Sequence, residues 1–183
     1  MKTESNIMYI IRLAGTLLLI TSIVAGLLAG VNAITAPRIA ELDAQKVQNA
    51  IETVLPGGGE AVDYYTDETG LVSKVYASDT GYAIEVTPVG FDNTITMMVG
   101  VDKAGNVLGI SIVSHTETAG LGAVSAANTS AGEAFRGQFV GTSGSVAVSK
   151  DGGELDAITG ATITSRAVCA GVNAALACVA NMG

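Results

Sequence analysis

Residues 95–114, ITMMVGVDKAGNVLGISIVS, carry the clearest structural signal in this chain. Apolar and polar residues alternate on both sides of residues 103–106, where Gly105 and Asn106 suit a tight turn. The pattern predicts a β-hairpin with strands over residues 95–101 and 107–114.

Two more alternating runs, residues 71–78 and 82–89, precede this hairpin, and residues 145–149 resemble a final strand. Strands in succession, without helices between them, predict an α+β fold with an antiparallel meander and flanking helices. Residues 123–139 are expected to form a short helix leading to a loop. Apolar residues recur at helical spacing from about Ser165, which predicts a C-terminal helix capped by the Ser and Thr side chains before it.

An uncharged segment of 24 residues, 13–36, lies near the N-terminus. As a helix it is long enough to cross a hydrocarbon core of roughly 30 Å, so we expect a transmembrane helix after a short tail, 1–12. A helical linker, 37–59, and a domain over 60–183 are expected to follow. The alternative is a cleaved signal peptide, but its apolar core usually has about 7–15 residues. Positive charges flank the segment evenly and give no orientation.

The chain has a formal charge of −8, and residues 1–36 contribute +1, which leaves −9 for the rest. Such an acidic domain argues against binding nucleic acid or anionic lipid surfaces, and an anionic cofactor would be held by amides and hydroxyls. Cys169 and Cys178 would lie on opposite faces of a helix, about 13.5 Å apart along its axis, which is too far for a disulfide. With no CxxC pair or His/Cys cluster, we expect buried thiols and no metal site within the chain.

Residues 156–165, DAITGATITS, form a polar turn that opens onto the predicted helix. A helix start of this kind exposes unpaired backbone N–H groups beside side-chain hydroxyls and attracts a phosphate or another anion. The absence of GxGxxG and GxxxxGKS patterns argues against a dinucleotide fold or a P-loop. The candidate binding residues are Asp156, Thr159, Gly160, Ala161, Thr162, Thr164 and Ser165.

This segment resembles the flavinylation motif Asp-x-x-Ser/Thr-Gly-Ala-Thr of the FMN-binding subunits of Rnf and Na+-pumping NADH:quinone reductase complexes. The matching positions are Asp156, Thr159, Gly160, Ala161 and Thr162. The resemblance implies that Thr162 carries FMN covalently through a phosphoester, which a separate flavin transferase makes. Thr164 is the alternative attachment hydroxyl, and Asp156 either guides the transferase through a metal or serves as a turn residue.

Residues 115–122, HTETAGLG, preceded by residues 98–105, are similar to the segment of the same family that lies against the isoalloxazine ring. Family members commonly have Pro where this chain has Ala119. The resemblance implies a wall beside the flavin, with Leu121 as apolar contact and with glycines that permit close approach; its residues are Glu117, Thr118, Gly120, Leu121 and Gly122. The alternative is that Glu117 and Thr118 simply form a polar loop. A lone histidine such as His115 is more often structural or exposed than catalytic.

The resemblance implies the electron-transfer G subunit of the membrane-bound, ion-translocating ferredoxin:NAD+ oxidoreductase (Rnf) complex. This chain would be an electron carrier with one spanning helix in the cell membrane and its FMN domain outside the cytoplasm. One apolar helix offers no polar path for an ion, so translocation would need the other integral and peripheral subunits. Alternatives are the C subunit of a Na+-pumping NADH:quinone reductase and a membrane-tethered binding module without a cofactor.

Overall fold

The computed structural model describes residues 2–63 and 69–182, with side chains from residue 7 onward. The chain divides into two compact units, Met1–Gln45 and Lys46–Gly183. Helix α1, Lys2–Val54, extends from the first unit into the second, with Pro37 inside it. Most of the residues of the expected tail, 1–12, and of the expected helical linker, 37–59, lie within α1.

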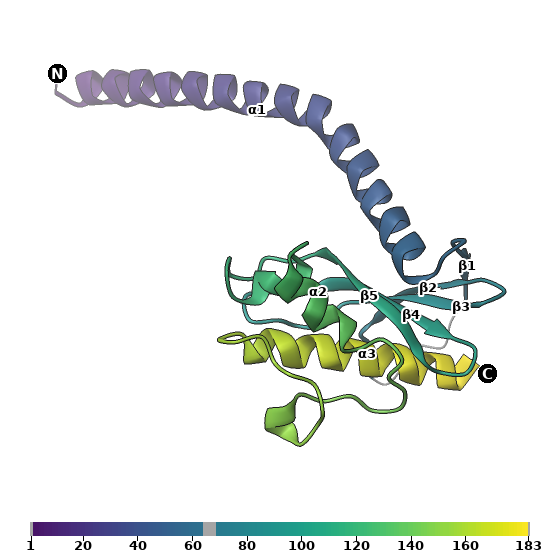
Figure 1. Ribbon diagram of the computed structural model, residues 1–183. Coiled ribbons are helices and arrows are strands. Elements are labelled where there is room, and N and C mark those ends of the chain that lie inside the picture. Colours follow the sequence, from purple (N-terminus) through teal and green to yellow (C-terminus); the bar gives the residue numbers. More distant parts are fainter. Residues whose placement is uncertain (1, 64–68, 183) are drawn as a thin grey trace. The chain divides into compact units, whose positions relative to one another are not determined.

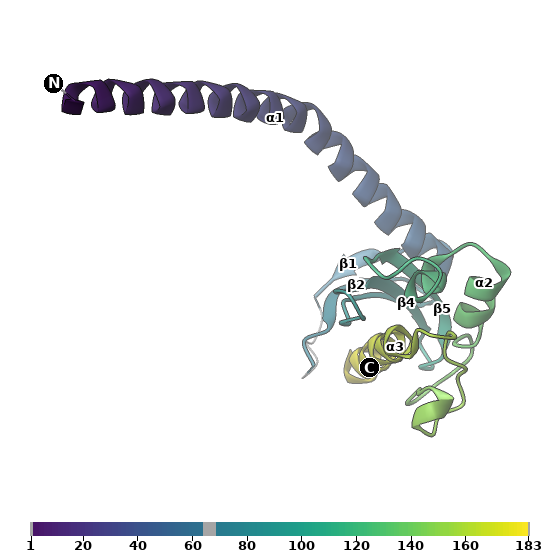
Figure 2. The ribbon, with the colours of Figure 1, turned by 90° about the vertical axis from the view of Figure 1, so that its left-hand side faces the viewer.

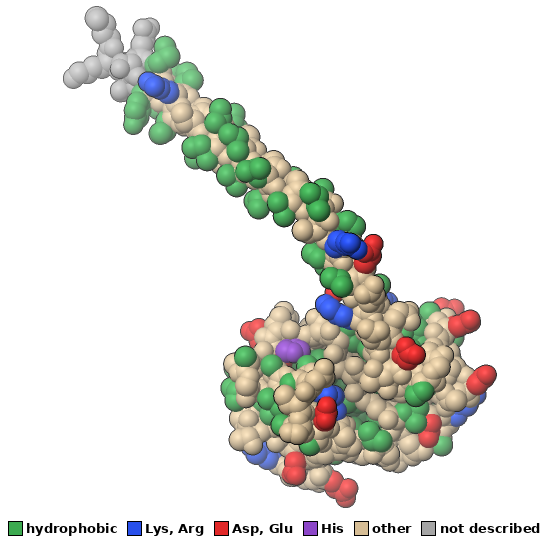
Figure 3. Space-filling model, turned by 45° about the horizontal axis from the view of Figure 1, so that its top comes forward, with side chains coloured by type: hydrophobic (Ala, Val, Ile, Leu, Met, Phe, Trp, Pro, Cys, Tyr) green, Lys and Arg blue, Asp and Glu red, His purple; other side chains and the backbone are tan. Residues whose placement is uncertain are grey.

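The first unit is a largely apolar helix, and its side chains are exposed over residues 7–45. Leu17 is 63% exposed and Ile34 is 75% exposed, and Figure 3 shows hydrophobic side chains along the helix. The hydroxyls of Thr16, Thr21 and Thr35 donate to backbone carbonyls three or four residues earlier, so these polar groups are satisfied within the helix. The helix has the length and composition of a membrane span, as expected.

The second unit contains a five-stranded antiparallel sheet in the order β1-β2-β3-β4-β5, which confirms the predicted meander (Figure 1). The predicted hairpin is β4–β5, and the Asp102 carboxylate accepts hydrogen bonds from the Ala104 and Asn106 amides in its turn. The short edge strand β1 was not predicted, because three residues are too few to show alternation. The strands are β1 (Glu60–Val62), β2 (Val72–Ala77), β3 (Gly81–Val86), β4 (Thr96–Asp102) and β5 (Val107–Ser114).

One face of the sheet packs against α3, Thr162–Met182, which lies along it in both ribbon views (Figures 1 and 2). Ile84 pairs with Val99, Val99 pairs with Ile110, and all three side chains are buried in this core. A membrane span is also possible for α3 by length and composition, but 67% of its apolar window is buried in the domain. We therefore describe α3 as a core helix.

The thiols of Cys169 and Cys178 are both buried in α3, and neither is in a disulfide. They are nine residues apart, and both are covered because α3 leaves only a narrow stripe of its surface exposed. Burial raises the pKa of the Cys169 thiol to about 11, and the nearby charge of Asp151 adds to this effect. The expectation that both thiols are buried in a helix is confirmed.

The other face of the sheet is covered by the last turns of α1, which belong to the second unit. Val54 and Ile51 are buried there against Ala83 and Met98. Gly100 lies directly beneath the helix, since a Cβ at this position would overlap the Val54 carbonyl oxygen. The sheet is thus enclosed between the end of α1 and α3, and the loops at its edges are held in place by both.

The connection from β5 to α3 differs from the prediction in two places. The expected helix within 123–139 is present as the 3-10 turn η1, Gly122–Ala126, followed by α2, Ser130–Gly137. The expected strand over 145–149 is wrong. Val146 and Val148 alternate inward beside α3, but no strand among the described residues pairs with them, and Val148 makes an isolated bridge to Leu155. The 3-10 turn η2, Ser149–Asp151, follows.

The close approach of α1 to the sheet predicts that alanine has different effects on stability at the two paired glycines Gly100 and Gly109. Gly100→Ala should lower the free energy of unfolding by about 1–3 kcal/mol, because the new methyl group must displace Val54. Gly109, its partner across β4–β5, has its nearest neighbour 3.9 Å from the new Cβ, so Gly109→Ala should be neutral or stabilising by up to about 1 kcal/mol. Urea unfolding of the detergent-solubilised chain, followed by circular dichroism, measures both; equal losses would contradict the packing described here.

Candidate functional site

A pocket of about 280 Å³ lies where the loop after β5 meets the start of α3. It brings together eight of the residues singled out in the sequence, from both motifs. It also contains Phe91, Lys150 and Ile163, which the sequence reasoning missed. The lining residues are Phe91, Glu117, Thr118, Leu121, Gly122, Lys150, Gly160, Ala161, Thr162, Ile163 and Thr164.

The start of α3 presents backbone amides to this pocket. The first helical hydrogen bond runs from the Ser165 amide to the Ala161 carbonyl, 3.0 Å apart, so the amides of Thr162, Ile163 and Thr164 have no acceptor within the described helix. Gly160, with φ of 77°, turns the chain into the helix. The helix therefore begins three residues before the predicted start, and the Thr hydroxyls lie inside its first turn rather than capping it.

The Thr162 hydroxyl lies beside a cation. The Lys150 ammonium group in η2 donates a hydrogen bond to Thr162 Oγ1 at 3.1 Å. An acidic domain was expected to hold an anion with amides and hydroxyls alone, and Lys150 adds a positive charge to that set. In the sequence, the one indication of this role is that Lys150 lies shortly before the motif 156–165 in a chain with few positively charged residues.

A salt bridge next to Lys150 ties η2 to the first turns of α3. Arg166 donates to both oxygens of the Asp151 carboxylate, at 2.6 and 2.7 Å. These hydrogen bonds lower the pKa of Asp151, and Asp151 raises the pKa of Arg166. The two-point contact fixes the direction of η2 as well as its distance from the helix.

Glu117 is buried at the back of the pocket, with 7% of its surface exposed, and its carboxylate joins three segments. One oxygen accepts the Thr164 hydroxyl at 2.5 Å, and the other accepts the Phe91 amide at 2.8 Å. A Cβ at Gly90 or Gly122 would overlap these carboxylate oxygens. Glu117 therefore holds the site together, and Gly122 makes room for Glu117 and Thr164 within the protein.

The remaining predicted residues lie outside this pocket. Ser165 is buried, accepts the Ile158 amide and donates to the Ala161 carbonyl, both at 3.0 Å. Gly120, Asp156 and Thr159 line a hollow of about 610 Å³ beside α2. The Gln138 side-chain amide donates to the Asp156 carbonyl and accepts from the Asp156 amide, and these two hydrogen bonds hold the turn in place.

His115 and the segment before it are structural in this fold. His115 Nδ1 accepts the Glu117 amide at 3.2 Å, so it supports the turn that positions Glu117. Residues 98–105 form most of β4 and its turn, and Gly105 lines a different cavity of about 620 Å³. Residues 98–105 therefore contribute no side chain to the pocket at Thr162.

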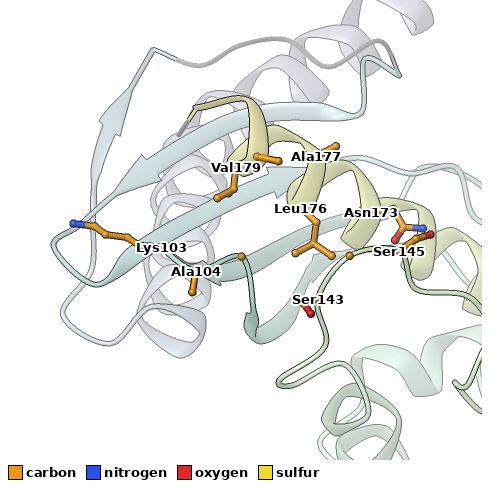
Figure 4. A pocket seen from close by; sticks show the side chains of 11 residues that line it. Lys103, Ala104, Ser143, Ser145, Asn173, Leu176, Ala177 and Val179 are labelled. Carbon is orange, nitrogen blue, oxygen red and sulfur yellow. The ribbon is translucent and has the colours of Figure 1, made fainter.

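That larger cavity lies between the β4–β5 turn and the second half of α3 (Figure 4). Its walls are mainly small and apolar, and Lys103 extends away from it. Asn173 is engaged with both the amide and the carbonyl of Val146, at 2.8 and 2.9 Å. This cavity contains no residue from the segments 115–122 and 156–165. Within the part of the chain that the structure describes, no three His, Cys, Asp or Glu side chains are grouped to hold a metal.

The burial of Glu117 predicts that it stabilises both loops around the pocket. Glu117→Gln should lower the free energy of unfolding by about 1.5–3 kcal/mol, because charge-assisted hydrogen bonds are lost. Hydrogen exchange at the Phe91 amide should also become faster. Thr118→Ala, at an exposed position on the same pocket wall, is the control and should change stability by less than about 0.5 kcal/mol. An unchanged Phe91 exchange rate in Glu117→Gln would rule out this bridging role.

Two protein families match the chain in separate regions. The FMN-binding domain matches residues 90–177, which include the whole pocket. The RnfG N-terminal region matches residues 1–54, the span of α1. The two matches together cover the membrane helix and residues 90–177 of the domain, which contain the candidate site.

Curated relatives are similar over most of their length. The G subunit of the ion-translocating oxidoreductase complex of Yersinia pestis is 36% identical over 180 residues, covering 88% of this chain and 86% of the relative. The protein of that name from Photorhabdus laumondii is 33% identical, with 84% and 82% covered. A Methanosarcina acetivorans relative of the same name is 29% identical, with 88% and 89% covered. By its sequence, its membrane helix and its FMN-binding domain, this chain belongs to the family of G subunits of ion-translocating oxidoreductase complexes.

Proposed function

We propose that this chain relays electrons within an Rnf complex through an FMN attached by a phosphoester to Thr162. The observation that carries the proposal is the setting of the Thr162 hydroxyl. It is partly exposed in the pocket, at a helix start with free amides, and it contacts the Lys150 ammonium group. This combination suits an oxygen that bears a phosphoryl group.

The other candidate hydroxyl, that of Thr164, is poorly suited to attachment. Thr164 is 1% exposed, and its hydroxyl already donates to Glu117. Esterifying it would require the buried carboxylate to lose its partner, which is costly in a low-dielectric interior. Accessibility and hydrogen bonding thus favour Thr162.

The rest of the pocket fits the flavin ring. Phe91, Leu121 and Ile163 line it although they are 66%, 42% and 49% exposed. Large apolar side chains gathered at the mouth of a pocket are typical of a ligand site, where a flat apolar group covers them. The residues present therefore fit both ends of FMN, its apolar ring and its anionic phosphate.

When bound, FMN supplies the redox chemistry. The amides of Thr162 to Thr164 and the charge of Lys150 would hold its phosphate, and the apolar side chains of the pocket would shield the ring from water. A pocket of about 280 Å³ is at the lower limit for ligand sites, so part of the cofactor would remain accessible to redox partners. That exposure suits an electron carrier.

The membrane arrangement follows from the same proposal. Helix α1 crosses the cell membrane once, and the FMN domain lies outside the cytoplasm, where a covalent tether prevents loss of the cofactor. A separate flavin transferase attaches the FMN. Ion translocation takes place in the complex with its other subunits, because α1 offers no polar path for an ion.

The attachment predicts a simple result in a host that expresses the flavin transferase. Thr162→Ala should abolish flavin fluorescence of the denatured protein band, because the accepting oxygen is gone, and membrane insertion should be unaffected. Thr162→Ser keeps the oxygen and should remain fluorescent. In-gel fluorescence measures both; a bright Thr162→Ala band would move the attachment site elsewhere, and a dark wild-type band would contradict covalent flavin altogether.

A further inference from the structure

We propose that Lys150 is a positioning residue for flavin attachment, which orients the Thr162 hydroxyl and offsets the negative charge that arises on its oxygen. This inference rests on the proposed function, since it concerns the reaction that loads the cofactor. It assigns a role to a residue outside both sequence motifs.

The geometry places one cation at the reacting oxygen. Lys150 Nζ is 3.1 Å from Thr162 Oγ1, although twelve residues separate them in the chain. Since the ammonium group donates to this oxygen, the hydroxyl proton points away from Lys150. A positive charge at this distance also stabilises an oxygen that is losing its proton.

The residues next to Lys150 hold it in place. The neighbouring Asp151 carboxylate receives two hydrogen bonds from Arg166, one turn along α3 from Thr162. A lysine side chain has many rotamers, so its contact with Thr162 depends on the fixed path of η2. The Asp151–Arg166 pair supplies that restraint, while Asp151 itself places a negative charge near the site.

The reaction balances without any redox change. Thr162 Oγ1 forms a bond to the phosphorus of FMN in a flavin dinucleotide, and the phosphoanhydride bond to the departing nucleoside monophosphate breaks. The hydroxyl proton passes to a base of the transferase. As the oxygen becomes an ester oxygen, the phosphodiester retains one negative charge, and Lys150 lies within reach of it.

The test is the rate at which purified flavin transferase and a flavin dinucleotide label the full-length chain in detergent, read as in-gel fluorescence. Lys150→Gln should lower kcat for the acceptor protein by roughly five- to tenfold, as expected for loss of one charge contact near a protein surface, with little change in KM. Lys150→Arg keeps the charge and should recover most of the rate. Lys103→Gln removes an exposed lysine at the β4–β5 turn and should label like the wild type.

The outcomes distinguish this inference from the proposed function. If the wild type labels and Lys150→Gln labels as fast as Lys103→Gln, or changes only KM, the role of Lys150 is overturned while covalent attachment stands. If the wild type does not label, the proposed function itself fails. Equal thermal unfolding midpoints of the Lys150 variants show that a slower rate is not caused by unfolding.

The restraint of Lys150 by the Asp151–Arg166 pair has its own test. In this test, the change in charge and the change in the position of Lys150 predict opposite effects on the labelling rate. Asp151→Ala removes a negative charge near the phosphate, so electrostatics alone would speed labelling. Loss of the restraint on Lys150 would slow it, and that is the expected result. Glu154→Ala removes the same charge from an exposed position three residues later and is the control. If Asp151→Ala is labelled as fast as this control or faster, the Asp151–Arg166 pair does not hold Lys150 in place.

Discussion

The buried carboxylate of Glu117 is the constraint on which the site depends. A carboxylate removed from water must find donors, and Glu117 takes them from Thr164 at the start of α3 and from the Phe91 amide. Three segments far apart in the chain are thereby fixed around one pocket. Gly90 and Gly122 are required because any Cβ there would occupy the space of the carboxylate oxygens.

The sheet gives this contact its rigid support. Helix α3 packs along one face of the sheet while the last turns of α1 cover the other, so the start of α3 is held against the loop after β5. The helix start then supplies unpaired amides, and η2 supplies Lys150 through the Asp151–Arg166 pair. A domain with a large negative charge thus presents a local positive site for an anion.

The sequence predicted those parts whose signal is local. The β4–β5 hairpin was predicted because alternation and the Gly105 turn lie within one segment. Thr162 stays a prediction, which rests on a contiguous motif. The start of α3 was placed three residues late, because Thr162 and Thr164 do not continue the apolar stripe on which helix prediction relies. Lys150 and Phe91 could not be found locally, since tertiary packing alone brings them to the pocket. Ser165 and Glu117 stay predicted cofactor contacts, and the structure adds hydrogen bonds from both to other groups of the protein.

The covalent attachment can be located by tandem mass spectrometry of peptides from the wild-type protein, expressed together with a flavin transferase. The fragment ions should place the mass of one FMN, less one water, on Thr162, with Thr159 and Thr164 unmodified. An FMN on Thr164, or FMN released intact on denaturation, would contradict the arrangement in which Lys150 and the start of α3 receive the phosphate at the Thr162 oxygen.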